Sequence, residues 1–144
     1  MTRKHAVVAA VGLALFGGCQ SSNPAANASS ADVKAALARG VAQIRGSHDK
    51  EKLHAKLLHT LARLRSVRAS TPVGREARSL AIQGFASMLR GVESQLAFIQ
   101  NDSGNVEAAT RDARRADRSL KRGASLLRAA GRALGVQVGS LNGY

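Results

Sequence analysis

The stretch Ile82–Ile99, IQGFASMLRGVESQLAFI, carries the clearest structural signal in the sequence. Its large apolar residues recur at alternating intervals of three and four, at Ile82, Phe85, Leu89, Val92, Leu96 and Ile99. This spacing is the a/d pattern of a heptad repeat, in which one face of a helix packs along its length against neighbours. The pattern predicts a long helix over residues 72–100 within a helical bundle.

A second long helix is predicted over residues 106–134, and its two core positions differ in size. The a positions are Val106, Ala113, Leu120, Leu127 and Leu134, and the d positions are Ala109, Ala116, Gly123 and Ala130. Small residues at one core position favour closely approaching helices. In the helix 72–100, Ala77, Gly84 and Gly91 form another seven-residue repeat off the main seam. We interpret it as a contact face for the first helical segment or for a second copy, with packing inside the chain favoured.

Two shorter helices are predicted upstream, over residues 32–45 and 48–69, with Gly46 as a kink or a break between them. Thr71 is expected to cap the helix that begins at Pro72, and Ser103 or Asn105 is expected to cap the last helix. Short turns between long helices place neighbours antiparallel. The sequence therefore predicts an all-α fold over residues 32–135, an elongated antiparallel three-helix bundle with coiled-coil-like packing. It becomes a four-helix bundle if Gly46 breaks the first helix, and a short tail follows over 136–144.

The N-terminus differs in composition from the helical part. A basic start, Arg3-Lys4-His5, precedes eleven apolar residues over 6–16, a length that suits the core of a signal peptide. Spanning a bilayer takes ~20 apolar residues, so this run is too short for a transmembrane helix. Gly18 then precedes Cys19, the only cysteine, so the chain cannot form an internal disulfide.

Residues 3–19 resemble the signal sequence of bacterial lipoproteins, in which a small residue directly precedes an invariant cysteine. The resemblance implies cleavage between Gly18 and Cys19 and a diacylglyceryl group on the Cys19 thiol. Residues 1–18 would then be the signal peptide, and the small, uncharged residues 19–31 the lipidated cysteine and a flexible tether. The mature chain would be lipid-anchored to a bacterial membrane and face the periplasm or the exterior, with inner or outer membrane left open. The alternatives are an ordinary secretory signal or a buried helix.

The chain is strongly basic, with a formal charge of +13. The heptad register of the last helix turns eight cations away from the seam: Arg111, Arg114, Arg115, Arg118, Lys121, Arg122, Arg128 and Arg132. A second basic cluster surrounds Pro72 and comprises Arg63, Arg65, Arg68, Arg75 and Arg78. We interpret the last helix as a candidate anion-binding face for membrane head groups or a cell-wall polymer. The competing interpretation is a solvated face that specifies only solubility.

The favoured hypothesis is a lipid-anchored extracytoplasmic envelope protein with a structural or adaptor role, whose basic last helix contacts an anionic surface. The alternative is an oligomeric or partner-binding lipoprotein subunit that uses a helix groove. A basic nucleic-acid-binding protein is a remote alternative, because the export signal and the scarcity of stacking aromatics argue against it.

Neither catalysis nor metal binding is predicted. Glu51-x-x-His54 supplies half of the motif of ferritin-like metal sites, and the sequence holds no second one. We interpret His48, His54 and His59 as solvated or interfacial side chains. A narrow bundle offers no obvious cleft, and no G-x-S-x-G, P-loop or dinucleotide motif occurs. The prediction is therefore a protein that is not an enzyme, with no metal and no cofactor.

Overall fold

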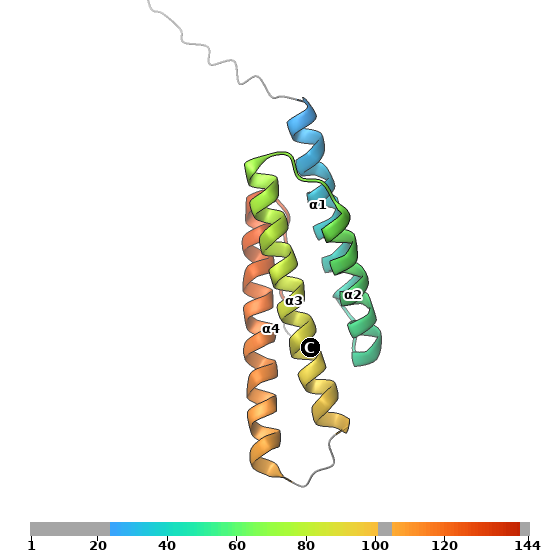
Figure 1. Cartoon of the computed structure of the whole chain (residues 1–144), viewed down its shortest axis with the longest axis vertical. Helices are drawn as coiled ribbons and strands as arrows, with labels where there is room; N and C mark the ends of the chain where they lie inside the picture. Colours follow the sequence, from blue (N-terminus) through green and yellow to red (C-terminus); the bar gives the residue numbers. More distant parts are fainter. Residues whose placement is uncertain (1–23, 101–104, 142–144) are drawn as a thin grey trace, which may run out of the picture.

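The computed structural model describes residues 24–100 and 105–141, and side chains from residue 30 onward. Four helices make up this part of the chain, α1 (Pro24–Ile44), α2 (Lys50–Ser66), α3 (Pro72–Gln100) and α4 (Val106–Leu134), and it contains no strand. The all-α prediction is confirmed (Figure 1).

The first helix begins earlier than predicted. We expected a helix from residue 32, preceded by a tether over 19–31, but α1 begins at Pro24. Proline is favoured in the first turn of a helix, and the segment that follows it is rich in alanine, the best helix former. The lack of apolar periodicity before Asp32 therefore did not mark the helix start. Residues 24–31 belong to α1, and only 19–23 of the predicted tether lie before it.

The break at Gly46 separates α1 from α2. Gly46 has φ +71, a left-handed conformation that ends a helix and that glycine adopts without steric cost. Asp49 begins the next helix as its N-cap, since its side chain accepts a hydrogen bond from the Lys52 amide at 3.0 Å. The α2 helix is therefore shorter at each end than the predicted range 48–69.

The predicted caps of the two long helices are confirmed. The Thr71 hydroxyl accepts a hydrogen bond from the Gly74 amide at 2.9 Å, and the Asn105 side chain accepts one from the Ala108 amide at 3.0 Å. These side chains satisfy amide groups that the first turn of a helix leaves without a partner.

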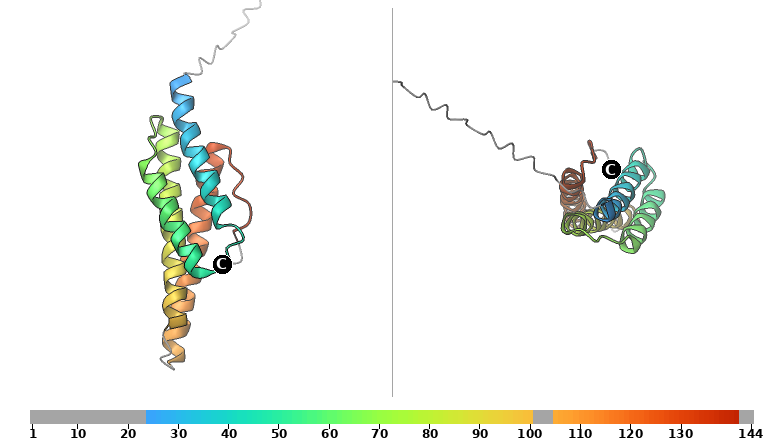
Figure 2. Two further views of the ribbon diagram at one scale, coloured as in Figure 1. Left: turned by 90° about the vertical axis from the view of Figure 1, so that its right-hand side faces the viewer. Right: turned by 90° about the horizontal axis from the view of Figure 1, so that it is seen from above.

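The helices differ in how far they run along the molecule. Figure 1 shows α3 and α4 side by side over their whole length, as an antiparallel hairpin. The α1 and α2 helices cover only the part of this hairpin away from the α3–α4 turn, and α1 extends beyond the hairpin's other end (Figures 1 and 2). The N-terminal end of α1 and the α3–α4 turn therefore lie at opposite ends of an elongated molecule.

The helix α3 contacts α4 through its small residues. A Cβ atom built on Gly84 would lie 2.8 Å from Leu127 Cγ and 3.1 Å from the Gly123 carbonyl oxygen. One built on Gly91 would lie 2.7 Å from Leu120 Cγ and 3.1 Å from the Ala116 carbonyl oxygen. The repeat of Ala77, Gly84 and Gly91 is thus an internal contact face, as favoured, but its partner is α4 and not the first helical segment.

The large apolar repeat of α3 faces α1 and α2. The Phe85 ring is fully buried and reaches Gly40 in α1, beside Thr60 of α2. Residues on the same heptad seam share this side of the helix. Because α1 and α2 end before α3 does, Leu96 is only partly buried and Ile99 is 67% exposed. The predicted seam is therefore buried or partly buried from Ile82 to Leu96 and becomes exposed surface at Ile99.

The segment after α4 is part of the fold. Gly135 ends α4 in a left-handed conformation, φ 63, and the Val136 amide donates to the Gly131 carbonyl at 2.8 Å. The chain then reverses, and Arg45 Nη2 donates to the Val138 carbonyl at 2.8 Å. Val138 and Leu141 are buried in the same core as Ile44. The predicted short tail is thus held against the core as far as Leu141, with Arg45, just after α1, bonded to it.

Candidate anion-binding face

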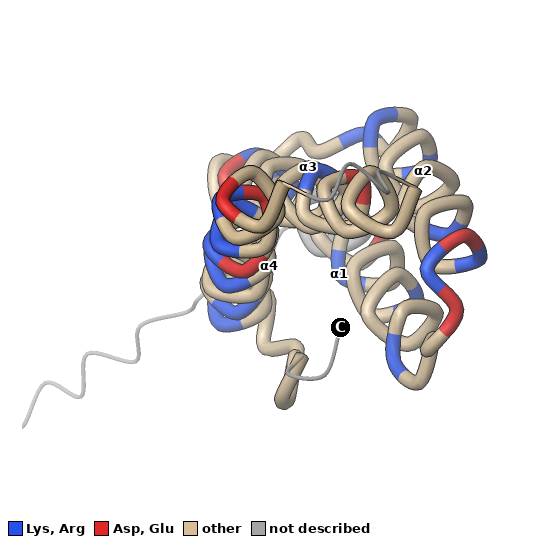
Figure 3. The backbone as a smooth tube through the Cα atoms, turned by 90° about the horizontal axis from the view of Figure 1, so that it is seen from below, with Lys and Arg blue, Asp and Glu red and all other residues tan. Residues whose placement is uncertain are grey.

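The eight cations of α4 lie on one exposed face. All eight are exposed, as the heptad register predicts: Arg111, Arg114, Arg115, Arg118, Lys121, Arg122, Arg128 and Arg132. Figure 3 shows the blue band that they form on the side of α4 turned away from α1 and α2. From Arg111 to Arg132 the face runs about 32 Å at 1.5 Å per residue.

Few acidic groups neutralise this face. Lys121 Nζ pairs with Asp117 Oδ2 at 2.8 Å, at the i,i+4 spacing that brings side chains together on a helix. This is the one ion pair that α4 makes among the described residues. An exposed pair contributes little to stability, and α4 keeps eight cations against three carboxylates. The face therefore keeps a clear excess of positive charge.

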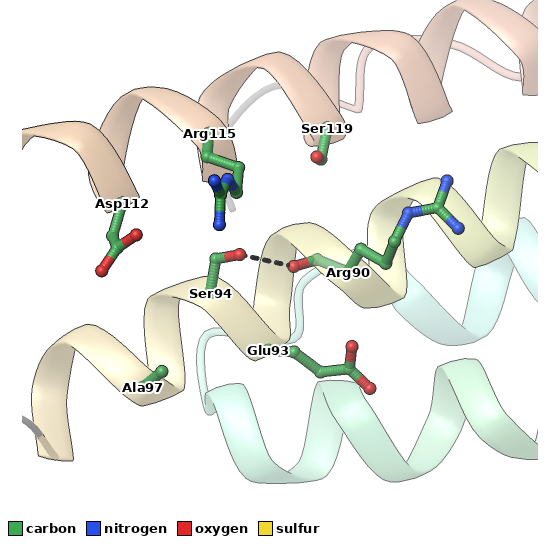
Figure 4. A pocket seen from close by; sticks show the side chains of 7 residues that line it. All are labelled: Arg90, Glu93, Ser94, Ala97, Asp112, Arg115 and Ser119. Carbon is green, nitrogen blue, oxygen red and sulfur yellow. Dashed lines mark hydrogen bonds between the residues drawn. The ribbon is translucent and has the colours of Figure 1, made fainter.

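A shallow groove of about 510 Å³ lies beside the basic face, between α3 and α4. Arg115 of α4 points toward Ser94 of α3, while Arg90 and Glu93 point away from the middle of the groove (Figure 4). The Ser94 hydroxyl donates to the Arg90 carbonyl at 2.9 Å. The groove shares one cation, Arg115, with the basic face, and because Arg90 and Glu93 point away from its middle it does not form a converging polar site.

The second basic cluster has a structural role that the sequence did not reveal. Arg78 Nε donates to the Leu64 carbonyl at 2.8 Å, and its Nη2 donates to the Arg65 carbonyl at 2.5 Å. Arg75 Nη1 donates to the Ser70 carbonyl at 2.6 Å. Cations suit the last turn of a helix, where carbonyl groups lack amide partners. Arg78 therefore holds the end of α2 against the start of α3, and Arg75 holds the connecting segment at Ser70.

The histidine region brings together one pair across helices. His54 Nε2 of α2 lies 3.4 Å from Glu93 Oε1 of α3. No sequence motif predicted this contact. His48 and His59 are exposed. Among the described residues, no group of three His, Cys, Asp or Glu side chains is placed to hold a metal ion.

A second groove, of about 240 Å³, lies between α3 and α4, and one of its lining residues, Leu120, also packs against the hydrophobic core that α1 and α2 help to form. Phe98, Ala113, Ala116 and Leu120 give it an apolar lining, and Ser94, Gln95 and Asp117 add polar groups. We call it the inner groove. The sequence predicted no cleft here, because the heptad pattern does not show where the covering helices end.

The predicted anchor residues, Gly18 and Cys19, lie outside the described residues. Of the helices in the described part, none is long and apolar enough to cross a bilayer. Comparison with known proteins gives no match to a family model, to a curated protein or to a solved structure.

Proposed function

We propose that this chain is a lipid-anchored extracytoplasmic envelope protein with a structural or adaptor role, and that the basic face of α4 binds an anionic surface. The single observation that carries the proposal is the array of eight exposed cations along one side of one helix. A cation held close to an anionic surface contributes about 1 kcal/mol, so several acting together can hold the protein against it.

The arginine side chains of the α4 face differ from several arginines elsewhere in the chain in the contacts that they make. Arg45, Arg75 and Arg78 donate to backbone carbonyls and so have a place in the fold. On α4, the described contacts include none that ties an arginine side chain to the core, and the face is free to meet a partner. Its chemistry suits phosphate or carboxylate groups, which guanidinium groups bind through paired hydrogen bonds.

The predicted lipid anchor would place a membrane surface close to the helical part of the chain. Cys19 precedes α1 by five residues, a span of about 17 Å when extended. Lipidation of Cys19 would therefore keep the N-terminal end of α1 near the membrane. Since the basic face runs parallel to the long axis, binding of that face to a flat surface lays the molecule along it.

The test of the face is charge reversal. We expect the quadruple variant with Arg111, Arg115, Arg118 and Arg122 each changed to Glu to lose most binding to isolated cell wall and to vesicles containing anionic lipid, measured by co-sedimentation at low salt. The matched control reverses four exposed cations elsewhere, Lys34→Glu, Lys52→Glu, Arg63→Glu and Arg65→Glu, with the same change in net charge. Equal binding by the two variants would reject the α4 face as the site.

The test of the anchor is separate. Replacing Cys19 with Ala removes the thiol that would carry the diacylglyceryl group, and we expect the protein to leave the membrane fraction at high salt. High salt is needed because it screens the contribution of the basic face. Membrane retention equal to that of the unchanged chain would reject lipid anchoring while leaving the α4 face untested by this result alone.

A further inference from the structure

The inner groove is an apolar surface that no described element covers. Phe98 is 46% exposed at one end of it, and Leu120 is partly buried at the other. Leu120, which lines the groove, also packs against the hydrophobic core that contains Ile44 of α1 and Leu141 of the tail, so the groove adjoins the side of the hairpin on which α1 and the tail lie. The occupant must therefore be another molecule or a segment of this chain that extends past the end of α1.

The segment before α1 cannot reach the inner groove. It departs from the far end of α1, whose 21 residues span about 30 Å. On the proposed function, cleavage before Cys19 leaves only residues 19–23 ahead of α1, a span of at most about 17 Å when extended. Even when folded straight back along α1, this segment would end well before the end of that helix.

The segment after α4 runs back along the molecule toward the inner groove. Its Val138 side chain packs against Gly131, where a built Cβ would lie 2.5 Å from Val138 Cγ2. An extended chain advances about 3.4 Å per residue and a helix 1.5 Å, so three extended residues match about seven helical ones. By this count Leu141 reaches the level of Ala124, and Tyr144 reaches the level of Asp117, a residue that lines the inner groove.

The size of the groove fits one side chain better than a second protein. The uncovered side of the hairpin is two helices wide, about 20 Å, and about 15 Å long, so two copies pairing through it would bury on the order of 600 Å². Stable interfaces bury more than about 1,000 Å². A volume of about 240 Å³ is also smaller than the usual range for small-molecule sites, from about 300 Å³ upward.

We propose that the inner groove is a binding site for an aromatic side chain and that it takes Tyr144 of the same chain. The ring would pack on Phe98 and Leu120, in the offset or edge-on contact that aromatic pairs favour. The hydroxyl would donate to the Asp117 carboxylate, which pairs with Lys121 through Oδ2 and keeps Oδ1 as an acceptor. In this arrangement residues 142–144 continue the anchored tail and cover the inner groove.

The composition of the chain makes the test direct. Tyr144 is the only tyrosine, and the chain has no tryptophan, so the emission of the protein reports on this one ring. The full chain would be reconstituted in phosphatidylcholine vesicles, which contain no other protein, and titrated with acrylamide, a neutral quencher that the basic charge of the protein does not attract. We expect a quenching constant several-fold below that of N-acetyltyrosinamide.

Two matched variants locate the site. Ala113→Glu places a carboxylate in the groove at an exposed position, and we expect it to raise the quenching constant to that of the free compound. Ser125→Glu makes the same charge change at an exposed position of α4 outside the groove, and we expect the constant of the unchanged chain. Equal constants for the two variants, or full accessibility in the unchanged chain, would overturn the proposal.

Two further measurements test whether the ring binds within its own chain and whether it binds in the inner groove. Protection within one chain does not depend on concentration, so protection that disappears on dilution would place the ring in a second copy and overturn the proposal. If circular dichroism shows that Ala113→Glu is unfolded, nuclear Overhauser contacts in the unchanged chain decide instead. We expect contacts from the Tyr144 ring to the methyl groups of Leu120 and Ala116, and their absence would refute the site.

Discussion

Gly123 is the position at which the close approach of α3 and α4 can be tested most sharply. A Cβ atom on Gly123 would lie 2.5 Å from Met88 Cγ, 2.8 Å from the Gly84 carbonyl oxygen and 3.0 Å from the Met88 amide nitrogen. Carbon atoms in contact normally lie about 3.5–4.0 Å apart. Met88 can move its side chain, but two of the three contacts are backbone atoms of α3. The change Gly123→Ala therefore forces the two helices apart.

The expected loss follows from two opposing contributions. Overpacking a close contact costs about 1–3 kcal/mol, while replacing a helical glycine with alanine gains about 0.8–1.0 kcal/mol. Because two of its contacts are backbone atoms, we place the overpacking cost of Gly123→Ala at about 2–3 kcal/mol and expect a net loss of about 1–2 kcal/mol in the free energy of unfolding. The changes Gly84→Ala and Gly91→Ala should cost less, because each meets mainly a leucine side chain and only one carbonyl oxygen, at 3.1 Å.

The measurement is urea unfolding followed by circular dichroism at 222 nm, with the slope of the transition checked for each variant. Ser125→Ala is the control, since it improves helix propensity at an exposed site of the same helix and should leave stability equal or slightly higher. A Gly123→Ala protein as stable as the Ser125→Ala protein would refute the close approach. In that case the small d positions of α4 would need another explanation.

Two other perturbations follow from the structure. Phe85→Ala empties a fully buried site and should cost about 3–5 kcal/mol in urea unfolding, whereas Ile99→Ala, at a residue 67% exposed, should change stability by no more than about 0.5 kcal/mol. The hydrogen bond from the Lys52 amide, together with the Lys52 side chain, lowers the pKa of Asp49 below its ordinary value of 3.8. A lowered carboxyl pKa stabilises the fold above 3.8 and loses this contribution as the pH falls through the folded value, so acid should destabilise the unchanged chain slightly more than Asp49→Asn. Unfolding curves at pH 6 and pH 2 for the two proteins would check this, and identical acid sensitivity would count against the cap.

The sequence predicted α3 well and its partners poorly, for one physical reason. A period of three and four residues shows which side of a helix is buried, but not which neighbour buries it. Ile82 and Phe85 were taken as the main seam because they are large. The α4 helix packs instead on Gly84 and Gly91, where the absence of side chains permits the closest contact. Their seven-residue spacing was the available signal.

Contacts that depend on segments without regular secondary structure, or on residues far apart in the sequence, could not be predicted. Val138 and Leu141 are apolar residues in a segment without periodicity, and burial of such residues depends on a chain reversal that the αL conformation of Gly135 permits. The pair of His54 and Glu93 joins residues 39 positions apart, which no local pattern encodes. The caps at Thr71 and Asn105 were predictable because capping depends only on neighbouring residues.

The structure divides the arginines into two groups that the sequence presents alike, and this difference makes the charge-reversal test of α4 interpretable. Arg78 donates to the carbonyl groups of Leu64 and Arg65, so Arg78→Glu would leave these acceptors without their donor and place a carboxylate beside them. We expect a loss of about 1–3 kcal/mol in urea unfolding. Arg118→Glu, on the exposed face, should stay within about 0.5 kcal/mol of the unchanged chain, because its charge repels like charges nearby and the described contacts give it no place in the core. If Arg118→Glu proved as destabilising as Arg78→Glu, loss of surface binding by the α4 variant could reflect unfolding; if it does not, that loss reports on the face itself.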